Sequence, residues 1–513
     1  MERRTFLYVS GVAAASYALG ADAKPGATVE TTYGKVRGTA VGKVQAFKGI
    51  RYGADTSGAN RFLAPKKPAS WTGVQDAFEY GPESPQVQPH TEIPEVRATV
   101  QPCPMGEDCL RLNVWTPNTG SGRRPVMVWL HGGGFTSGNG GYTIYEGANL
   151  ARRQDVVVVT INHRLNSFGF TYLGEGASNV GMLDCIAALE WVRDNIAKFG
   201  GDPANVTIFG QSGGGAKVST LLAMPGAKGL FHRAIIQSGS NITGVTKADA
   251  QKSAETLMAK VGAKTLADLQ KVPYEQLLNA SNTTQGLRTS PVVDGVTLPT
   301  DPFSPGAPAL SANIPVLIGS TETEVTFFPN QPIDPIDDAQ LLARVKAAVA
   351  RTTDAQAKEL IDAYRKGRPG VSNIDVALIV ESDVRFRAAV LTEAELKSAQ
   401  PAPVYMYYFT WRTPVHDGKL KSLHTLDIPF AFANCDQAPT MTGTGKDRLP
   451  LEDKMSAAWA AFARTGNPNH KGLPTWPKFD TTTRATMILD NTCKVVNDPN
   501  GTERKLLGSL RRA

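Results

Sequence analysis

A G-x-S-x-G pentapeptide at residues 210–214 lies directly between a strand pattern and a helix pattern, which is the context that a nucleophile elbow requires. Residues 206–209 (VTIF) form a short apolar run rich in β-branched residues, typical of a buried strand. Residues 216–224 (AKVSTLLAM) have helical character and are followed by Pro225-Gly226, which ends a helix. The flanking glycines would let strand and helix approach closely around the serine. Ser212 is therefore a candidate nucleophile, and the alternative is a glycine-rich turn with a solvated serine.

Strand and helix patterns alternate along most of the chain, which predicts an α/β fold. The predicted strands of the main sheet are residues 110–115, 126–130, 156–161, 206–209, 234–237, 315–319 and 404–409. Residues 126–130 and 156–161 are apolar on both faces, as expected for strands of a sheet that is covered on both sides. Residues 179–199 carry a helical apolar stripe, and we expect Gly200-Gly201-Asp202-Pro203 to end that helix.

Four further segments lie outside this alternation. Residues 27–76 contain short β-rich runs such as 28–36, which predict an antiparallel edge before the main sheet. Residues 80–108 are rich in Pro, Glu and Gln, and we expect them to form a long surface loop. Residues 246–285 and 336–400 are expected to be helix-rich insertions between strands.

The N-terminus has the pattern of an export signal. Arg3-Arg4 is followed by Phe6-Leu7 and an apolar run, and Ala21-Asp22-Ala23 is typical of a cleavage site. The apolar run is shorter than the roughly 20 residues of a membrane span, and no second such run follows, so no stable membrane span is predicted. The arginine pair indicates a twin-arginine signal, with a general secretory signal as the alternative. We expect residues 1–23 to be cleaved and residues 24–513 to act as a single domain in the periplasm or outside the cell.

Charge and cysteine content narrow the possible partners. The formal net charge of +7 is spread along the chain without basic runs, so nucleic-acid binding is not expected. No Cys or His spacing is typical of a metal site, and neither a metal nor a cofactor is predicted. In an oxidising compartment, five cysteines allow at most two disulfides. The cysteines are Cys103, Cys109, Cys185, Cys435 and Cys493, of which Cys185 is expected to be a buried free thiol.

A second glycine-rich motif, His131-Gly132-Gly133-Gly134, follows the predicted strand at residues 126–130. Acyl transfer to a serine requires backbone N–H groups aimed at the oxyanion, and glycines let the backbone come close enough to supply them. The alternative is a loop that is merely flexible. We expect His131 to support this loop and not to act as the catalytic base.

The residues alone leave two candidates for the base and two for the acid. A serine nucleophile needs both partners, in the chain order Ser, then Asp or Glu, then His. His416 and His424 both follow the last predicted strand, and Glu322 and Glu324 both follow the strand before it. Both choices therefore stay open at this point.

Several segments resemble the type-B carboxylesterases, a family that includes bacterial esterases, liver carboxylesterases and cholinesterases. The resemblance extends from about residue 28 to 500. The matching segments are 107–115 (EDCLRLNVW), 131–135 (HGGGF), 195–203 (NIAKFGGDP), the pentapeptide at 210–214, 237–240 (QSGS) and the segment around His424. The resemblance implies an α/β-hydrolase fold, with a large, mostly parallel central sheet flanked by helices and carrying helical insertions. It also implies hydrolysis of a small-molecule carboxylic ester through an acyl-enzyme on Ser212, without a cofactor.

The same resemblance selects among the open candidates. In the family, the acid follows the glycine of its strand by five positions, and from Gly319 that position is Glu324. The base precedes an acidic-Ile-Pro-aromatic run, which matches His424 before residues 427–430. The implied oxyanion donors are the N–H groups of Gly133, Gly134 and Gly213.

Four positions depart from the family pattern. Glu324 is followed by Val325 where the family has glycine, which keeps Glu322 as a secondary candidate. Gly213 replaces the usual alanine, so one oxyanion donor is expected to be held less rigidly. Gln211 replaces the common glutamate and removes an anion beside the nucleophile.

The fourth departure is Ser84, which stands where the family has its first disulfide cysteine, so Cys109 is expected to pair with Cys103 or to stay reduced.

The expected activity is hydrolysis of neutral short- or medium-chain esters. A non-catalytic adhesion or binding protein on the same fold is the alternative from another class, and it predicts loss of the serine or the histidine, both of which are present. Lipases and esterases that degrade carbamates or toxins share the same machinery and remain alternatives within the enzymes.

Overall fold

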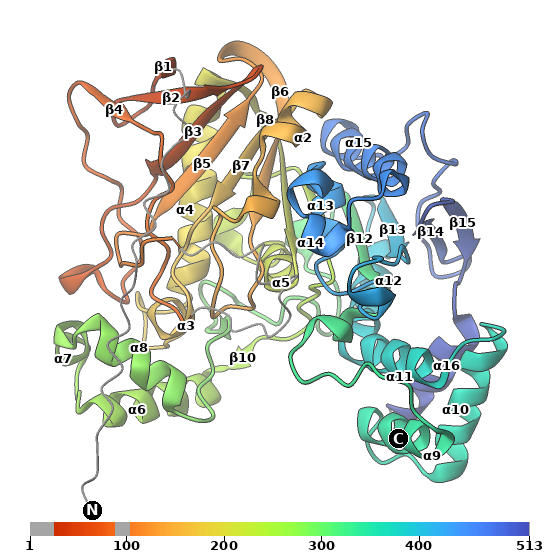
Figure 1. Cartoon of the computed structure of the whole chain (residues 1–513). Helices are drawn as coiled ribbons and strands as arrows, with labels where there is room; N and C mark the ends of the chain where they lie inside the picture. The colour runs from red at the N-terminus through yellow and green to blue at the C-terminus, as the bar shows by residue number, and fades with distance from the viewer. Residues whose placement is uncertain (1–24, 88–102, 512–513) are drawn as a thin grey trace, which may run out of the picture.

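The computed structural model describes residues 25–87 and 103–511, and a 13-stranded sheet runs through this part of the chain (Figure 1). The strand order is β1-β2-β3-β5-β7-β6-β8-β9-β12-β13-β14-β15, and the short strand β4 pairs with β2. In this spatial order, each strand from β1 to β7 is antiparallel to the next. Each strand from β7 to β14 is parallel to the next. The last pair, β14 with β15, is antiparallel. The large, mostly parallel sheet with an antiparallel edge is therefore confirmed.

The strands of the sheet are β1 (Pro25–Glu30), β2 (Lys35–Val41), β3 (Val44–Arg51), β4 (Val74–Asp76), β5 (Arg111–Thr116), β6 (Gly120–Leu130), β7 (Val157–Ile161), β8 (Phe199–Gln211), β9 (Arg233–Gln237), β12 (Val316–Thr321), β13 (Val404–Phe409), β14 (Ala485–Leu489) and β15 (Lys494–Asn497). A separate parallel pair consists of β10 (Val245–Thr246) and β11 (Val292–Val293). The helices are α2 (Ala148–Gln154), α3 (Asn166–Phe170), α4 (Val180–Asn195), α5 (Gly213–Leu221), α6 (Lys247–Val261), α7 (Leu266–Lys271), α8 (Tyr274–Thr283), α9 (Asp338–Ala348), α10 (Asp354–Lys366), α11 (Asn373–Ser382), α12 (Ala388–Ser398), α13 (Asp427–Phe432), α14 (Pro439–Thr442), α15 (Leu449–Thr465) and α16 (Gly501–Leu510).

Each face of the sheet has its own apolar core, because side chains alternate between the two faces of a strand. Val126, Val128 and Leu130 of β6 lie in the core that α4, α5 and α12 cover. Met127 and Trp129 lie in the other core, beneath α2, α13 and α15. All five side chains are fully buried, which explains why this strand reads as apolar on both faces.

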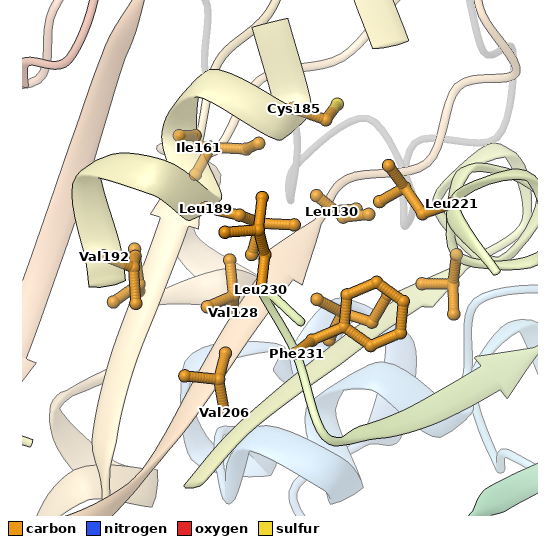
Figure 2. Close-up of a cluster of buried hydrophobic side chains, with 14 of the residues drawn as sticks. Val128, Leu130, Ile161, Cys185, Leu189, Val192, Val206, Leu221, Leu230 and Phe231 are labelled. Atoms are coloured by element: carbon orange, nitrogen blue, oxygen red, sulfur yellow. The ribbon is translucent and has the colours of Figure 1, made fainter. Parts of the chain in front are cut away.

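Figure 2 shows part of the first core, where Val128 and Leu130 lie among side chains from two helices. Leu189 and Val192 come from α4, and Leu221 comes from the last turn of α5. Full burial of one such side chain stabilises the fold by about 1.5 to 3 kcal/mol. This packing anchors α5 to the sheet, and the turn that carries Ser212 is anchored with it.

The parallel register aligns the carboxyl ends of four strands. Gln211 of β8 pairs with Gln237 of β9, and Gln237 pairs in turn with Gly319 of β12. Thr321 of β12 pairs with Phe409 of β13. Side chains that follow these strands therefore gather at one edge of the sheet, which is where an open α/β sheet binds its ligands.

The sequence-based elements agree with the structure in kind and differ at their ends. Residues 28–36 belong to two strands, β1 and β2, because the Thr31 N–H donates to the Gly34 carbonyl (2.9 Å) and closes a turn between them. Residues 200–203 were expected to end a helix, but α4 ends earlier, at Asn195, and these residues begin β8.

The helix-rich insertions at 246–285 and 336–400 are confirmed as α6 to α8 and α9 to α12. Two predictions fall wholly or partly outside the described residues: the export signal at 1–23, and the surface loop at 80–108, of which residues 88–102 are not described. In the described ranges, no helix is both long enough and apolar enough to cross a bilayer.

All five cysteines lie within the described ranges, and none forms a disulfide. Cys109 is fully buried, and its thiol contacts Ser84. Burial raises the pKa of the Cys109 thiol, so the protonated form is favoured. Of the two alternatives, pairing with Cys103 or a reduced thiol, the structure has the reduced thiol.

Candidate active site

Ser212 occupies the one-residue turn between β8 and α5. Its backbone has φ 57° and ψ −126°, a conformation that is strained for a residue with a side chain. The turn is this tight because Gly214 carries no Cβ: a Cβ there would lie 1.9 Å from the Leu130 carbonyl oxygen. The side chain of Ser212 is half-buried at the N-terminus of α5, as expected for a nucleophile elbow.

His424 and Glu324 meet at the same edge of the sheet. Glu324 begins a short 3-10 helix, η6 (Glu324–Phe327), after β12, and His424 follows β13. The Nδ1 of His424 is hydrogen-bonded to the Oε2 of Glu324, and both side chains are buried. The N–H of Thr321 donates to the other carboxylate oxygen of Glu324 (2.8 Å). This carboxylate therefore holds the imidazole by Nδ1 and does not contact Nε2.

The rival candidates lie elsewhere. The carboxylate of Glu322 accepts a hydrogen bond from the Arg412 guanidinium (3.1 Å). His416 is exposed at the start of the short helix η8 (His416–Gly418). The structure thus brings together Glu324 and His424 and places Glu322 and His416 in other surroundings.

Gln211, which directly precedes Ser212, has its side-chain amide next to the ring of His424. Its Nε2 lies 3.2 Å from each ring nitrogen of His424, within hydrogen-bond distance of both. In the described part of the chain, the Ser212 hydroxyl has no hydrogen bond to His424. Catalytic hydrogen bonds in unliganded enzymes are often long and tighten when substrate binds.

Three partly exposed aromatic rings surround His424. The ring centroids of Phe327, Phe328 and Phe386 lie 5.5, 5.6 and 4.7 Å from that of the imidazole. The Arg385 guanidinium lies 3.8 Å from the centroid of the Phe328 ring. The His424 ring is thus surrounded by apolar side chains, and the Arg385 guanidinium lies beside them. Sequence reasoning missed these side chains; Phe327 and Phe328 could have been found from their position directly after the acid.

The H-G-G-G loop provides a candidate oxyanion hole. Gly133 and Gly134 both have positive φ (86° and 63°) and are exposed beside the elbow. Within the described residues, the N–H groups of Gly133, Gly134 and Gly213 donate to no other group. A Cβ on Gly213 would lie 2.1 Å from the Gly134 carbonyl oxygen, so the family's alanine does not fit this arrangement. Close packing against Gly134, and not a side chain of its own, limits the freedom of Gly213.

His131 supports this loop from behind. Its Nδ1 contacts the Gly132 carbonyl oxygen (2.8 Å), and its ring stacks on that of His163 with centroids 4.8 Å apart. Burial lowers the pKa of His131 to about 3, so the imidazole is neutral at ordinary pH. A neutral, fully buried ring fits the supporting role expected of His131.

No part of the described chain brings three or more His, Cys, Asp or Glu side chains together as a metal site would require. The groups described above at this edge of the sheet are the serine hydroxyl, the imidazole, the carboxylate and the backbone N–H groups.

Comparison with known proteins places this chain in a family. The Carboxylesterase family model matches residues 25–506. A para-nitrobenzyl esterase of Bacillus subtilis (strain 168) is 36% identical over 500 residues, covering 93% of this chain and 98% of the relative. A phenmedipham hydrolase of Pseudarthrobacter oxydans is 34% identical over 485 residues, covering 91% and 96%.

Solved structures agree with these matches. The structure of an esterase from Clostridium hathewayi is 34% identical and has a TM-score of 0.83, covering 94% of this chain and 98% of that one. Because the family match spans nearly all of the described residues, and the folds agree over the same span, this chain belongs to the carboxylesterase family, has the α/β-hydrolase fold and is a carboxylic-ester hydrolase.

Proposed function

We propose that Ser212, His424 and Glu324 carry out ester hydrolysis as a catalytic triad. The observation that supports this most is the buried hydrogen bond between His424 and Glu324, at the edge of the sheet where the elbow presents Ser212. Ser212 Oγ attacks the ester carbonyl while His424 Nε2 takes its proton. His424 then protonates the leaving alcohol, and water cleaves the acyl-enzyme by the same route in reverse.

The developing oxyanion is bound by the N–H groups of Gly133, Gly134 and Gly213. Such donors stabilise the transition state because they are already oriented before charge develops. The free N–H groups and the close packing of Gly213 on Gly134 support this assignment.

For the substrate, we propose neutral esters with short or medium acyl chains. The rings of Phe327, Phe328 and Phe386 offer apolar surface next to the base, and Gln211 brings no charge to it. A second candidate is hydrolysis of phenmedipham, because one relative bears that name. The test is hydrolysis of p-nitrophenyl esters of graded acyl length, with kcat/KM expected to be highest for short or medium chains. A maximum at long chains, together with activation at an oil interface, would favour a lipase.

The enzyme is expected to discriminate against cationic alcohols. Residues 81–107 contain no tryptophan to act as a cation–π partner, and Gln211 stands where cholinesterase-like relatives have glutamate. The Arg385 guanidinium beside the Phe328 ring adds repulsion. A lost cation–π contact alone is worth up to about 2 kcal/mol when desolvated, which corresponds to a loss of up to about 30-fold in kcat/KM. The comparison is butyrylcholine against its uncharged isostere, 3,3-dimethylbutyl butyrate. A preference for the choline ester would show that another group supplies a cation site.

We also propose export through the twin-arginine route, with action in the periplasm or outside the cell. The motif in residues 1–23 supports this proposal. Replacing Arg3 and Arg4 with lysine is expected to leave precursor in the cytoplasm, because the receptor recognises the pair itself. Immunoblots of cell fractions measure the effect, and N-terminal sequencing of the wild type should begin near residue 24. Unaltered export of the variant would indicate the general secretory route.

A further inference from the structure

Lys217 is a fully buried lysine on α5, five residues after Ser212. Its Nζ donates to the carbonyl oxygens of Gly134 (2.8 Å) and His131 (3.0 Å), and the Phe135 ring centroid lies 5.2 Å away. Among the charged groups of the described residues, no carboxylate forms an ion pair with it. Burial lowers the pKa of Lys217 to about 7. Burying an amine without a counter-charge is unfavourable, so its contacts have to offset that penalty.

The two carbonyl groups that Lys217 holds bracket the proposed oxyanion donors. His131 and Gly134 are the first and last residues of the H-G-G-G motif, and the N–H groups of Gly133 and Gly134 lie between the held carbonyl groups. Fixing a peptide chain at both ends of so short a segment restricts the rotation of the peptide units between them.

The remaining carbonyl groups of the loop are also occupied. The Gly132 carbonyl contacts the Nδ1 of His131 (2.8 Å). The Gly133 carbonyl accepts hydrogen bonds from the N–H groups of Thr136 (3.2 Å) and Ser137 (3.1 Å). Every carbonyl of the loop is therefore engaged, whereas the donor N–H groups are free. Lys217 is the side chain from outside the loop segment that supplies two of these contacts.

Lys217 also joins the loop to the helix of the nucleophile. α5 begins at Gly213, whose N–H is the third proposed donor, and Lys217 lies about one turn further along the same helix. The carbonyl oxygen that limits space at Gly213 is that of Gly134, which Lys217 also holds. One helix thus carries one donor directly and controls the position of the other two.

We propose that Lys217 is a positioning residue that holds the H-G-G-G loop against α5 and so sets the spacing of the three oxyanion donors. The inference rests on the proposed oxyanion hole at Gly133, Gly134 and Gly213. The carbonyl groups of His131 and Gly134 each accept one hydrogen bond from Nζ. A neutral amine still has two N–H donors, so both hydrogen bonds can form whether Lys217 is charged or neutral.

The test is Lys217→Met, which keeps an unbranched side chain that is one atom shorter and removes the hydrogen-bond donors of the lysine. We expect kcat for p-nitrophenyl butyrate to fall roughly 10- to 100-fold, somewhat less than for loss of an oxyanion donor itself. KM should stay unchanged, because the loop acts on the transition state. A trifluoromethyl ketone, which adds to Ser212 as a tetrahedral oxyanion, should lose affinity by a similar factor.

Lys397 provides a matched control. It is a fully buried lysine in α12, and its Nζ donates to the Ser311 carbonyl and to Gln400 Oε1, both at 2.7 Å. Lys397→Met removes a comparable pair of contacts away from the elbow, so it should lower thermal stability and leave kcat and inhibitor affinity unchanged. Lys217→Gln keeps an N–H₂ group on a shorter side chain and is expected to show an intermediate loss of kcat. This variant is the test if Lys217→Met does not fold.

The outcomes separate this inference from the proposed triad. Folded Lys217 variants with the kcat and inhibitor affinity of the wild type would overturn the positioning role, as would a rise in KM alone. When Ser212→Ala is inactive in the same assay, wild-type behaviour of the Lys217 variants overturns only the positioning role of Lys217, and the proposed triad is retained. If Ser212→Ala keeps its activity, the proposed triad fails first, whatever the Lys217 variants show.

Discussion

Ser212→Ala is expected to remain folded and to lower kcat for p-nitrophenyl esters by roughly 10⁴ to 10⁶-fold, because the members of a triad act as a unit. Removing Oγ abolishes the acyl-enzyme route, and only the weak catalysis of the remaining binding groups persists. Loss of a half-buried hydroxyl leaves the packing of the elbow unchanged, since the turn depends on Gly214 and on the contacts of α5.

The measurement is kcat of the variant in a discontinuous assay at high enzyme concentration. Circular dichroism and thermal melting show whether the fold is retained. A burst of p-nitrophenol equal to the enzyme concentration should appear in the wild type when deacylation is slow, and it should be absent from the variant. Activity equal to that of the wild type would remove Ser212 from the mechanism.

Glu324→Gln is expected to lower kcat by roughly 10³ to 10⁴-fold, whereas Glu322→Gln should change it little. An amide at position 324 can offer its N–H₂ to His424 Nδ1, which favours the wrong tautomer of the base. Glu322 instead accepts from Arg412, whose side chain is about half exposed (47%), and such pairs contribute at most about 1 kcal/mol to stability.

The two glutamine variants are matched controls for each other, because both remove one negative charge after the same strand. The comparison is kcat and KM for one ester, measured side by side with thermal stability. If Glu322→Gln strongly lowers kcat while Glu324→Gln leaves kcat close to that of the wild type, the acid has been assigned two residues too far along the chain.

The parts of the site that depend on local sequence could be predicted from it. Ser212 was selected because a strand, a glycine-rich turn and a helix pattern follow one another within residues 206–224, and the H-G-G-G loop was selected because its glycines directly follow a predicted strand. The acid and the base could not be separated in this way, since Glu322 and Glu324 follow the same strand end. What separates them are contacts with distant residues, such as Arg412 with Glu322 and His424 with Glu324. The resemblance to a family, and not local pattern, selected Glu324 and His424.

Other features depend on packing that no pattern reveals. Lys217 sits in a helical pattern where a lysine normally faces solvent, and its burial results from the close approach of two glycine-rich segments. Phe386 reaches His424 from an insertion, in the π-helix η7 (Asp383–Arg387). Most elements after residue 430, including α15 and the strands β14 and β15, were not predicted individually.

The order of the strands also bears on when activity first arises during synthesis. The elbow and the oxyanion loop are complete once β6, β8 and β9 have paired, but the acid and the base follow β12 and β13, which add to the sheet beyond β9. Glu324 and His424 are 100 residues apart in the chain, and both are synthesised long after Ser212. A nascent or truncated chain that ends before β13 therefore presents its nucleophile without a base. With the proposed triad, hydrolysis is expected only after the segment that follows β13 has been synthesised and folded, so ester turnover would report a sheet that is assembled at least as far as β13 and not merely a formed elbow.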